Sequence, residues 1–495
     1  MELEFKRNKC PCLRWDLRDL QELEQTLEVK LTDGMPDIGN IIGVWGQCVL
    51  RSKQWRSTEA GVSGGILVWV LYTPAEGGPP RSVEAWLPLQ HSWTLQDAQR
   101  EGVIRTQWKL CSADARMLSA RKMMVRATVG ILSELLEPSE VELSEPVEVP
   151  QDLQLLRRSY PTMLPTEAGE KDFSLEQSFP LPGTEETGQL LSCRLFPKLT
   201  ELKTVSGRVV IKGVIGCHVL FTDQNSNICN TDLELEFSQL EDLSHQPETD
   251  PQVSVMLELT NLETEIQEGQ LHLKAGLAAQ YLVYEQKLLE RVEDAYSPIR
   301  DVTCTAEALE LPALLDTDIR SVQTEARLDC EEILDTSVYT GHPTAYIRGG
   351  KAQLQLPGFL RVLIRHPAGR LETQDTKWAQ PWELTVGDGV TASPMTTGQS
   401  QLQLSGTPGQ YQLTLDQEVS TALHSRQGLP MITALNAGEQ RQPEPGRPSV
   451  ILKRPDGATL WELAKNAGST VSAICEANRI TQEPVDDRIL LIPVL

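Results

Sequence analysis

The chain has 495 residues and a formal net charge of −24, from 69 acidic and 45 basic side chains. At roughly 100–200 residues per domain, this length predicts three to four domains. Such an acidic surface repels phosphate backbones and anionic lipid heads, which argues against nucleic acid and membrane partners. It suits a basic partner, or it serves only to keep the chain soluble.

The sequence shows no pattern typical of secretion or of a membrane span. Its longest apolar candidate, residues 66–72, has the length of a strand, and residues 1–18 mix charges without an apolar run. We therefore expect no membrane span and no ordinary signal peptide. The ten cysteines are scattered, which is typical of small buried side chains in a reducing compartment. The Cys10-Pro11-Cys12 pair has no histidine nearby, so neither a metal site nor a redox site is expected there.

The first elements along the chain are a strand at residues 27–31 and a turn that follows it. Pro36 fixes φ and Asp37 can cap free amides, as at the start of a helix. Residues 36–42 are therefore predicted to contain a few helical turns.

Two features of the sequence repeat at nearly the same interval. Residues 64–72 read as a glycine-led strand that returns at 83–87, and residues 213–221 with 233–237 repeat this hairpin pattern 149 residues later. A second hairpin pattern, at residues 108–127, recurs at 257–275. A third, more degenerate copy runs from about 301 to 437, with strands at 358–364 and 409–415.

These copies predict a mainly β fold of tandem antiparallel domains, sandwich-like or barrel-like and joined like beads. Ser159-Tyr160-Pro161 and Tyr296-Ser297-Pro298 are expected to be equivalent junctions between them, because proline ends a strand. The predicted domains are residues 1–156, 157–298 and 299–437. Residues 438–448 contain three prolines and two glycines and are predicted to be a linker.

The pattern changes in residues 449–495. A strand at 450–452 and a turn at 455–457 precede a helix at 460–467, which Thr459 can cap and Gly468 can end. Thr470 can cap a second helix at 471–477, and a last strand is expected at 488–493. The predicted order is strand, helix, helix, strand.

This C-terminal segment resembles a LysM domain in the turn at 456–461, in Leu463-Ala464-Lys465, in Asn478 and in the final strand at 490–493. The resemblance implies a shallow groove for N-acetylglucosamine polymers. The implied groove residues are Gly457, Ala458, Thr459, Leu460, Ile480 and Thr481. The usual Gly-Asp order before the threonine is replaced by Asp456-Gly457-Ala458, which favours a protein ligand over a glycan. Trp461 could belong to the core or serve as a platform for a sugar.

The upstream copies are similar to SPOCS domains in the turn at 32–42, in Leu181-Pro182-Gly183 and in Leu311-Pro312-Ala313. Tandem SPOCS-like β domains followed by a small βααβ LysM domain resemble the SipL-type spore-coat morphogenetic proteins of endospore-forming anaerobes. The resemblance implies a scaffold of the mother-cell cytoplasm that docks at the forespore surface. Its implied partner is the coat morphogenetic ATPase, bound through the LysM and β domains, and no cofactor is implied.

The sequence gives no indication of an enzyme. It contains no G-x-S-x-G, H-E-x-x-H or P-loop motif, and acidic clusters at 258–265 and 329–332 read as solvated strand faces. We therefore expect no catalytic residues, cofactor or metal. The alternative is a peptidoglycan-binding protein of the envelope, which would need a route of export.

Overall fold

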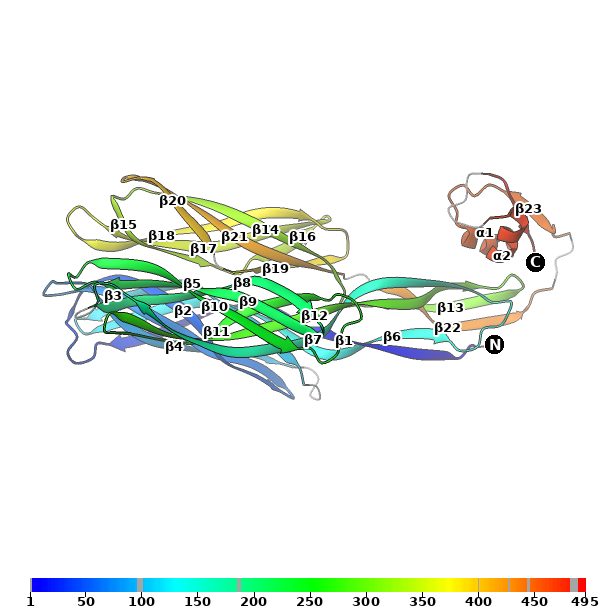
Figure 1. Ribbon diagram of the computed structural model, residues 1–495. Coiled ribbons are helices and arrows are strands. Elements are labelled where there is room, and N and C mark those ends of the chain that lie inside the picture. The colour runs from blue at the N-terminus through cyan, green and yellow to red at the C-terminus, as the bar shows by residue number, and fades with distance from the viewer. Residues whose placement is uncertain are drawn as a thin grey trace.

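The computed structural model describes residues 2–95, 101–184, 188–398, 400–425, 428–442, 446–480 and 488–495. These residues form 24 strands and two short helices, so the prediction of a mainly β fold is confirmed. Figure 1 shows an elongated molecule in which a broad β head continues into a narrower neck, with both helices at the far end of the neck. No helix among the described residues is both long and apolar enough to cross a membrane.

The first copy consists of two three-stranded antiparallel sheets, with strand orders β1-β6-β5 and β2-β3-β4. Apolar residues from both sheets form one buried cluster between them. The glycine-led strand at 64–72 lies in β3 and pairs with β4, as the hairpin pattern predicts. The bounds are β1 (Phe5–Lys30), β2 (Ile38–Arg56), β3 (Glu59–Pro74), β4 (Arg81–Thr94), β5 (Val103–Ser119) and β6 (Lys122–Pro146).

The second copy repeats this arrangement, with β12 between β7 and β11 and with β9 between β8 and β10. Its long strands β7 and β12 correspond to β1 and β6. The bounds are β7 (Gln154–Pro180), β8 (Gln189–Val205), β9 (Arg208–Thr222), β10 (Ile228–Asp242), β11 (Gln252–Gln267) and β12 (Gln270–Tyr296).

In the third copy each of the two long strands is divided in two. Strands β13 and β14 take the place of one long strand, and β22 and β21 take the place of its partner. Strand β14 also touches β7, so the second and third copies share one seven-stranded sheet. The bounds are β13 (Arg300–Leu309), β14 (Leu314–Leu328), β15 (Glu332–Thr340), β16 (Thr344–Arg348), β17 (Lys351–Arg365), β18 (Leu371–Thr385), β19 (Val390–Thr396), β20 (Gln401–Thr407), β21 (Gln410–Ser425) and β22 (Leu429–Gln440).

A glycine covered by an aromatic ring recurs in the central strand of each copy. A Cβ at Gly358 would lie 2.5 Å from the Trp378 ring, and one at Gly213 would lie 2.4 Å from the Phe237 ring. In the first copy, Gly65 is covered by Trp86 in the same way. Only glycine leaves room for a ring that crosses from the return strand. This packing explains why glycine-led strands reveal the repeat.

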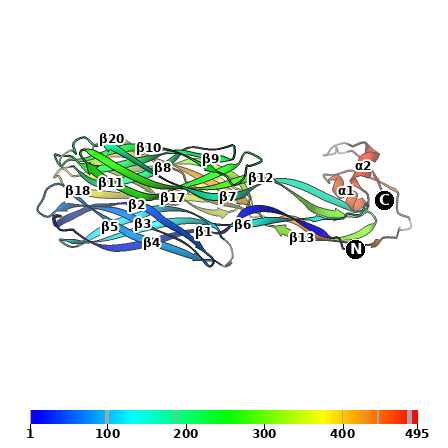
Figure 2. The ribbon, with the colours of Figure 1, turned by 60° about the horizontal axis from the view of Figure 1, so that its bottom comes forward.

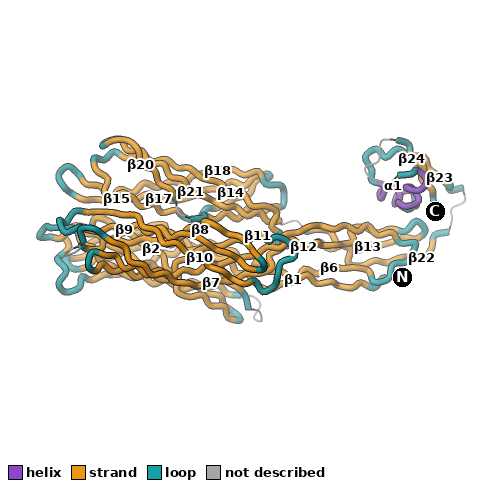
Figure 3. Tube along the Cα trace, in the orientation of Figure 1, coloured by secondary structure: helices purple, strands orange, loops and turns teal. Residues whose placement is uncertain are grey.

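The neck is built from three two-stranded ribbons, one from each copy, and it can be followed in Figures 1 and 3. The first half of β1 pairs with the last part of β6, β7 pairs in the same way with β12, and β13 pairs with β22. Figure 2 also shows the neck leaving one end of the head. Side chains of all three copies meet in one cluster, whose buried members are Cys12, Val141, Leu164, Leu289, Leu311 and Ala313. Leu311 and Ala313 follow β13 directly, and Leu309 and Leu429 of the third ribbon pack against the cluster.

In the head, a buried arginine from each copy reaches the next copy. Arg105 donates to the Ser254 hydroxyl at 3.1 Å, and Arg194 lies 3.4 Å from the Asp335 carboxylate. Arg361 connects the third copy back to the first, because it donates to the carbonyl of Ala113 at 2.9 Å. Apolar residues of all three copies also share a buried cluster. The expectation of separate beads is therefore wrong, since the copies share cores in both the head and the neck.

The helical turns predicted at residues 36–42 are also wrong, because β2 begins at Ile38. The guanidinium of Arg121 holds the preceding turn by donating to the carbonyls of Thr32 and Met35, at 3.0 and 3.1 Å. It also donates to the Asp37 carboxylate at 2.9 Å. A contact from a residue so distant in the sequence selects the extended conformation.

The expected junctions differ from one another in the structure. Ser159-Tyr160-Pro161 lies inside β7, where Tyr160 pairs with Leu289. Residues 147–153 connect the first two copies, and residues 297–299 connect the second to the third. The expected boundary after residue 298 falls between strands, whereas those after 156 and 437 fall within β7 and β22. The expected linker at 438–448 begins as strand, because β22 continues to Gln440.

Candidate functional site: the C-terminal module and its seat on the neck

The C-terminal module, residues 449–495, has the predicted strand–helix–helix–strand order. Its elements are β23 (Val450–Lys453), α1 (Leu460–Ala467), α2 (Val471–Asn478) and β24 (Leu490–Pro493). Local caps set the limits of both helices, as the sequence predicts. Thr459 and Glu462 form a capping box, Gly468 ends α1 with a left-handed φ of 65°, and the Thr470 side chain accepts from the Ala473 amide.

The turn before α1 contains the first predicted groove residues. Asp456 and Gly457 have φ values of 47° and 82°, and the Ala458 amide closes the turn on the Pro455 carbonyl at 2.9 Å. Gly457 is exposed and Ala458 is half-buried. This turn therefore offers backbone groups and a methyl group at the surface.

The next two predicted residues serve the helix and the core. The Thr459 amide donates to the Glu462 carboxylate at 2.8 Å, and its hydroxyl accepts from the Glu462 amide at 3.2 Å. The bonds from Thr459 lower the pKa of Glu462. Leu460 is 3% exposed and belongs to the module core. The Leu460 side chain is therefore closed to a ligand, whereas the exposed Thr459 side chain is engaged by Glu462.

The last two predicted residues lie beyond α2. The Ile480 amide donates to the Cys475 carbonyl at 3.0 Å, and its half-buried side chain packs against the module core. Ala458 packs against the same core, so the structure brings these two residues to one cluster. Thr481 lies outside the described residues.

Asn478 ties the end of α2 to the last strand. Its side-chain amide donates to the Leu491 carbonyl at 2.5 Å, and its side-chain oxygen accepts from the Leu491 amide at 2.8 Å. The amide thus satisfies both backbone groups of Leu491, as a neighbouring strand would. It closes the outer edge of β24 at this position.

The module is seated on the end of β12 by Asp294 and Tyr296. The Trp461 indole donates to Asp294 at 2.8 Å, and the Lys465 ammonium lies 2.7 Å from the same carboxylate. The Tyr296 ring meets Trp461 edge-on at 4.8 Å, and its hydroxyl donates to the Ser469 carbonyl at 3.1 Å. Tyr296 is 5% exposed and forms part of the module core. The neck therefore completes the core of the module.

The contacts between the module and β12 keep the carboxyl group of Asp294 ionised. Burial works to raise the pKa of Asp294, but hydrogen bonds from Lys465 and Trp461 outweigh it and the pKa is lowered. Burial raises the pKa of Tyr296 to about 12, so its hydroxyl stays protonated and able to donate. An anionic carboxylate thus faces a cationic amine and the N–H of an indole ring.

Sequence reasoning did not identify Asp294 and Tyr296 as contacts of the module. The Tyr-Ser-Pro motif indicated a junction, yet 167 residues separate Asp294 from Trp461 and no local pattern joins them. Of the two roles predicted for Trp461, the structure supports packing with the core, since its ring packs against the module core and also meets Tyr296 of the neck. Its ring is half-buried in this contact.

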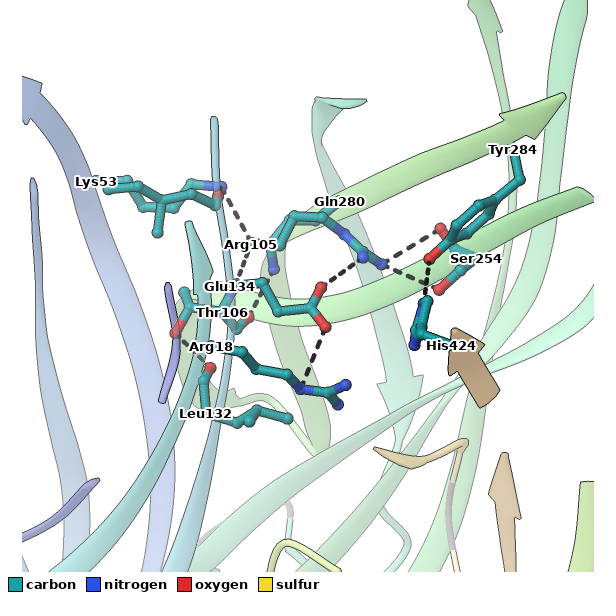
Figure 4. A network of polar contacts seen from close by, with 11 residues as sticks. Arg18, Lys53, Arg105, Thr106, Leu132, Glu134, Ser254, Gln280, Tyr284 and His424 are labelled. Atoms are coloured by element: carbon teal, nitrogen blue, oxygen red, sulfur yellow. Dashed lines mark hydrogen bonds and ion pairs between the residues drawn. The ribbon is translucent and has the colours of Figure 1, made fainter. Parts of the chain in front are cut away.

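Buried polar groups in the head join the copies (Figure 4). Glu134 pairs with Arg105 at 2.7 Å and with Arg18 at 3.5 Å. The Gln280 side chain exchanges two hydrogen bonds of 2.8 Å with the Thr106 backbone. The bonds of Gln280 link the second copy to the first, beside the Glu134 ion pairs within the first copy.

A second polar cluster joins the second and third copies. His218 bridges Asp232 at 2.6 Å and Asp335 at 2.5 Å. Burial works to lower the pKa of His218, but the two carboxylates outweigh it and the pKa is raised. Ser337 donates to Asp335 at 3.1 Å, so its hydroxyl faces a carboxylate and not the imidazole. This arrangement does not prepare a nucleophile.

Within the described ranges, no group of three or more His, Cys, Asp or Glu side chains could hold a metal ion. Comparisons of the chain with protein-family models, with curated proteins and with solved structures gave no match. The similarity to SPOCS and LysM domains therefore depends on the motifs in the sequence.

Proposed function

We propose that this protein is a non-enzymatic scaffold of endospore coat assembly, similar to the SipL-type proteins. In this proposal it works in the mother-cell cytoplasm, at the forespore surface. It docks to the coat morphogenetic ATPase there through its LysM-like module and its β copies.

The observation that carries the proposal is the placement of the module. Three ribbons, one from each copy, extend away from the head, and the module sits at the end of this neck (Figure 1). Side chains of β12 and the module fix that position through direct contacts. A rigid body that carries a small recognition unit at its tip is suited to holding partners apart at a defined distance.

The predicted groove supports a protein ligand over a glycan. Among its described residues, Leu460 is buried and Thr459 is engaged by Glu462. An N-acetyl sugar requires well-placed polar groups, and the exposed Thr459 hydroxyl is already hydrogen-bonded to Glu462. The altered turn before α1 agrees with this preference.

Binding of peptidoglycan is the second candidate, and one observation favours it. Gly457 is exposed in a turn whose backbone faces the surface beside the half-buried Ala458. Backbone amides and a small methyl surface suit an N-acetyl group. In this case the protein would act in the cell envelope, where peptidoglycan is found.

The two candidates are separated by presenting both ligands to the full chain. One arm measures co-elution with the purified coat ATPase on size exclusion, and the other measures co-sedimentation with purified peptidoglycan. The scaffold proposal predicts a complex with the ATPase and no enrichment in the peptidoglycan pellet. Sedimentation with peptidoglycan, without a complex with the ATPase, would overturn it.

A further inference from the structure

Exposed apolar side chains are concentrated in the C-terminal module. Of 16 large apolar side chains exposed among the described residues, five lie within residues 450–495, which is under a tenth of the chain. Concentrated apolar exposure on a folded surface marks a contact site more often than single exposed side chains do. The module is therefore the first place to look for a docking surface.

Four of these side chains lie on or beside the two-stranded sheet of the module. Leu452 is 70% exposed and is paired with Leu491, and Val450 lies two residues earlier on the same face. Ile489 is exposed next to β24. Side chains that point to the opposite face of the sheet, such as that of Ile492, are buried against the helices. Because strand side chains alternate between faces, the outer face of this sheet is apolar and uncovered.

The edges of this sheet are not equivalent. Asn478 occupies the backbone groups of Leu491, so the outer edge of β24 is closed there. In the described part of the chain, β23 pairs with β24 alone. Its other edge therefore presents unpaired backbone donors and acceptors, which are a template for an added strand.

The charged side chains around β23 indicate the charge of the partner strand that could be added there. Lys453 is the last residue of β23, Arg454 follows it, Arg488 precedes β24, and all three side chains are exposed. Residues 446–495 carry six basic and six acidic side chains and so have no net charge, whereas the whole chain has a net charge of −24. The module already binds an acidic residue of a neighbouring strand, since Lys465 pairs with Asp294 of β12. Complementary charge would steer an acidic partner to this edge.

We propose that the free edge of β23 and the apolar outer face of its sheet bind an extended segment of a partner protein. The segment has alternating acidic and apolar residues. It adds a third strand beside β23, its apolar side chains pack along Val450 and Leu452, and its acidic ones face Lys453 and Arg454. This inference rests on the proposed scaffold function and names the surface and the chemistry of the partner.

The test uses the full chain and two labelled eight-residue peptides. One peptide alternates Glu and Val, the other alternates Lys and Val, and binding is measured by fluorescence anisotropy. We expect the acidic peptide to bind and the basic one not to bind. Leu452→Asp, and separately Lys453→Glu with Arg454→Glu, should each weaken binding by at least about tenfold.

The matched control is Leu240→Asp, which changes a leucine that is 55% exposed on β10 in the head. We expect it to leave binding unchanged. Protection of α1 from hydrogen exchange shows whether each variant keeps the module folded, and the charge-reversal variant supplies the test if Leu452→Asp does not. Equal binding of both peptides, or full binding by folded β23 variants, would overturn the proposal.

The same variants separate this inference from the proposed function. If the native chain binds the coat ATPase and the β23 variants bind it equally well, the strand-addition surface is wrong and the scaffold function stands. If the native chain does not bind the ATPase but binds the acidic peptide as described, the scaffold function is wrong and the surface stands.

Discussion

Removal of the Tyr296 side chain should loosen the C-terminal module without disturbing the head. Tyr296 belongs to β12, yet it is 5% exposed within the module core and meets Trp461 edge-on. Its hydroxyl also donates to the Ser469 carbonyl at 3.1 Å. The stability of the module therefore includes a contribution from the neck, and Tyr296→Ala removes the part made by this ring and its hydroxyl.

The size of the effect follows from these contacts. Truncation of a buried aromatic ring to alanine costs about 3–5 kcal/mol, and this ring lies at an interface, so we expect about 3 kcal/mol. At 1.4 kcal/mol per factor of ten, the module should open roughly 100-fold more often. Tyr296→Phe keeps the ring and loses one hydrogen bond, which costs about 1 kcal/mol and raises opening by less than about tenfold.

Hydrogen exchange read by mass spectrometry measures this opening directly. We expect peptides covering α1 and α2 to exchange faster in Tyr296→Ala, with Tyr296→Phe between it and the native chain. Peptides from β9 in the head serve as the internal reference and should not change. Unchanged exchange in α1 and α2 of Tyr296→Ala would refute the idea that the neck completes the module core.

Three further predictions concern the head and the independence of the module. The carboxylates of Asp232 and Asp335 raise the pKa of His218 in the folded protein. The stabilisation of the fold by these contacts is therefore complete below the unfolded pKa of about 6.5, and it is lost as pH rises through the folded pKa. The Tm of the head should therefore fall between pH 6 and pH 9, and His218→Gln should flatten this dependence; an equally steep fall in the variant would contradict it. Gly358→Ala places a Cβ against Trp378 and should lower the free energy of unfolding by about 1–3 kcal/mol in urea, whereas Gly387→Ala, with nothing within 4 Å, should not. A chain that ends at residue 448 should keep one cooperative melt of the head and neck by calorimetry, and loss of that melt would show that the β body depends on the module.

Local chemistry allowed much of the fold to be predicted from the sequence. The caps Thr459, Gly468 and Thr470 act within a few residues, so the helices of the module were predicted with bounds within one residue. The repeat was found through glycines such as Gly213, whose covering ring comes from the adjacent strand of a hairpin. Both features depend on contacts that are close in sequence.

The errors arose where distant residues decide the structure. The turn at residues 36–42 is held by Arg121, whose guanidinium selects an extended chain there. The joined copies depend on buried arginines such as Arg194, whose partner Asp335 lies 141 residues away. The period-2 pattern gives the face of each strand but does not specify which sheet it joins.

The candidate site was predicted only in part for the same reason. The sequence placed Gly457 and Ala458 in an exposed turn, because an Asp-Gly pair is typical of a turn. The contacts of Trp461 and Lys465 with Asp294 could not be read from the module alone. Their partner lies on β12, in another copy of the repeat.

The central claim is that the module at the tip of the neck binds a protein. It is tested most directly by titrating the coat ATPase and an N-acetylglucosamine pentamer, in parallel, into the full chain and into the chain ending at residue 448. The account predicts that the full chain binds the ATPase, that the truncated chain binds it at least about tenfold more weakly, and that neither binds the sugar. Binding of the pentamer by the full chain alone, with no binding of the ATPase, would contradict it.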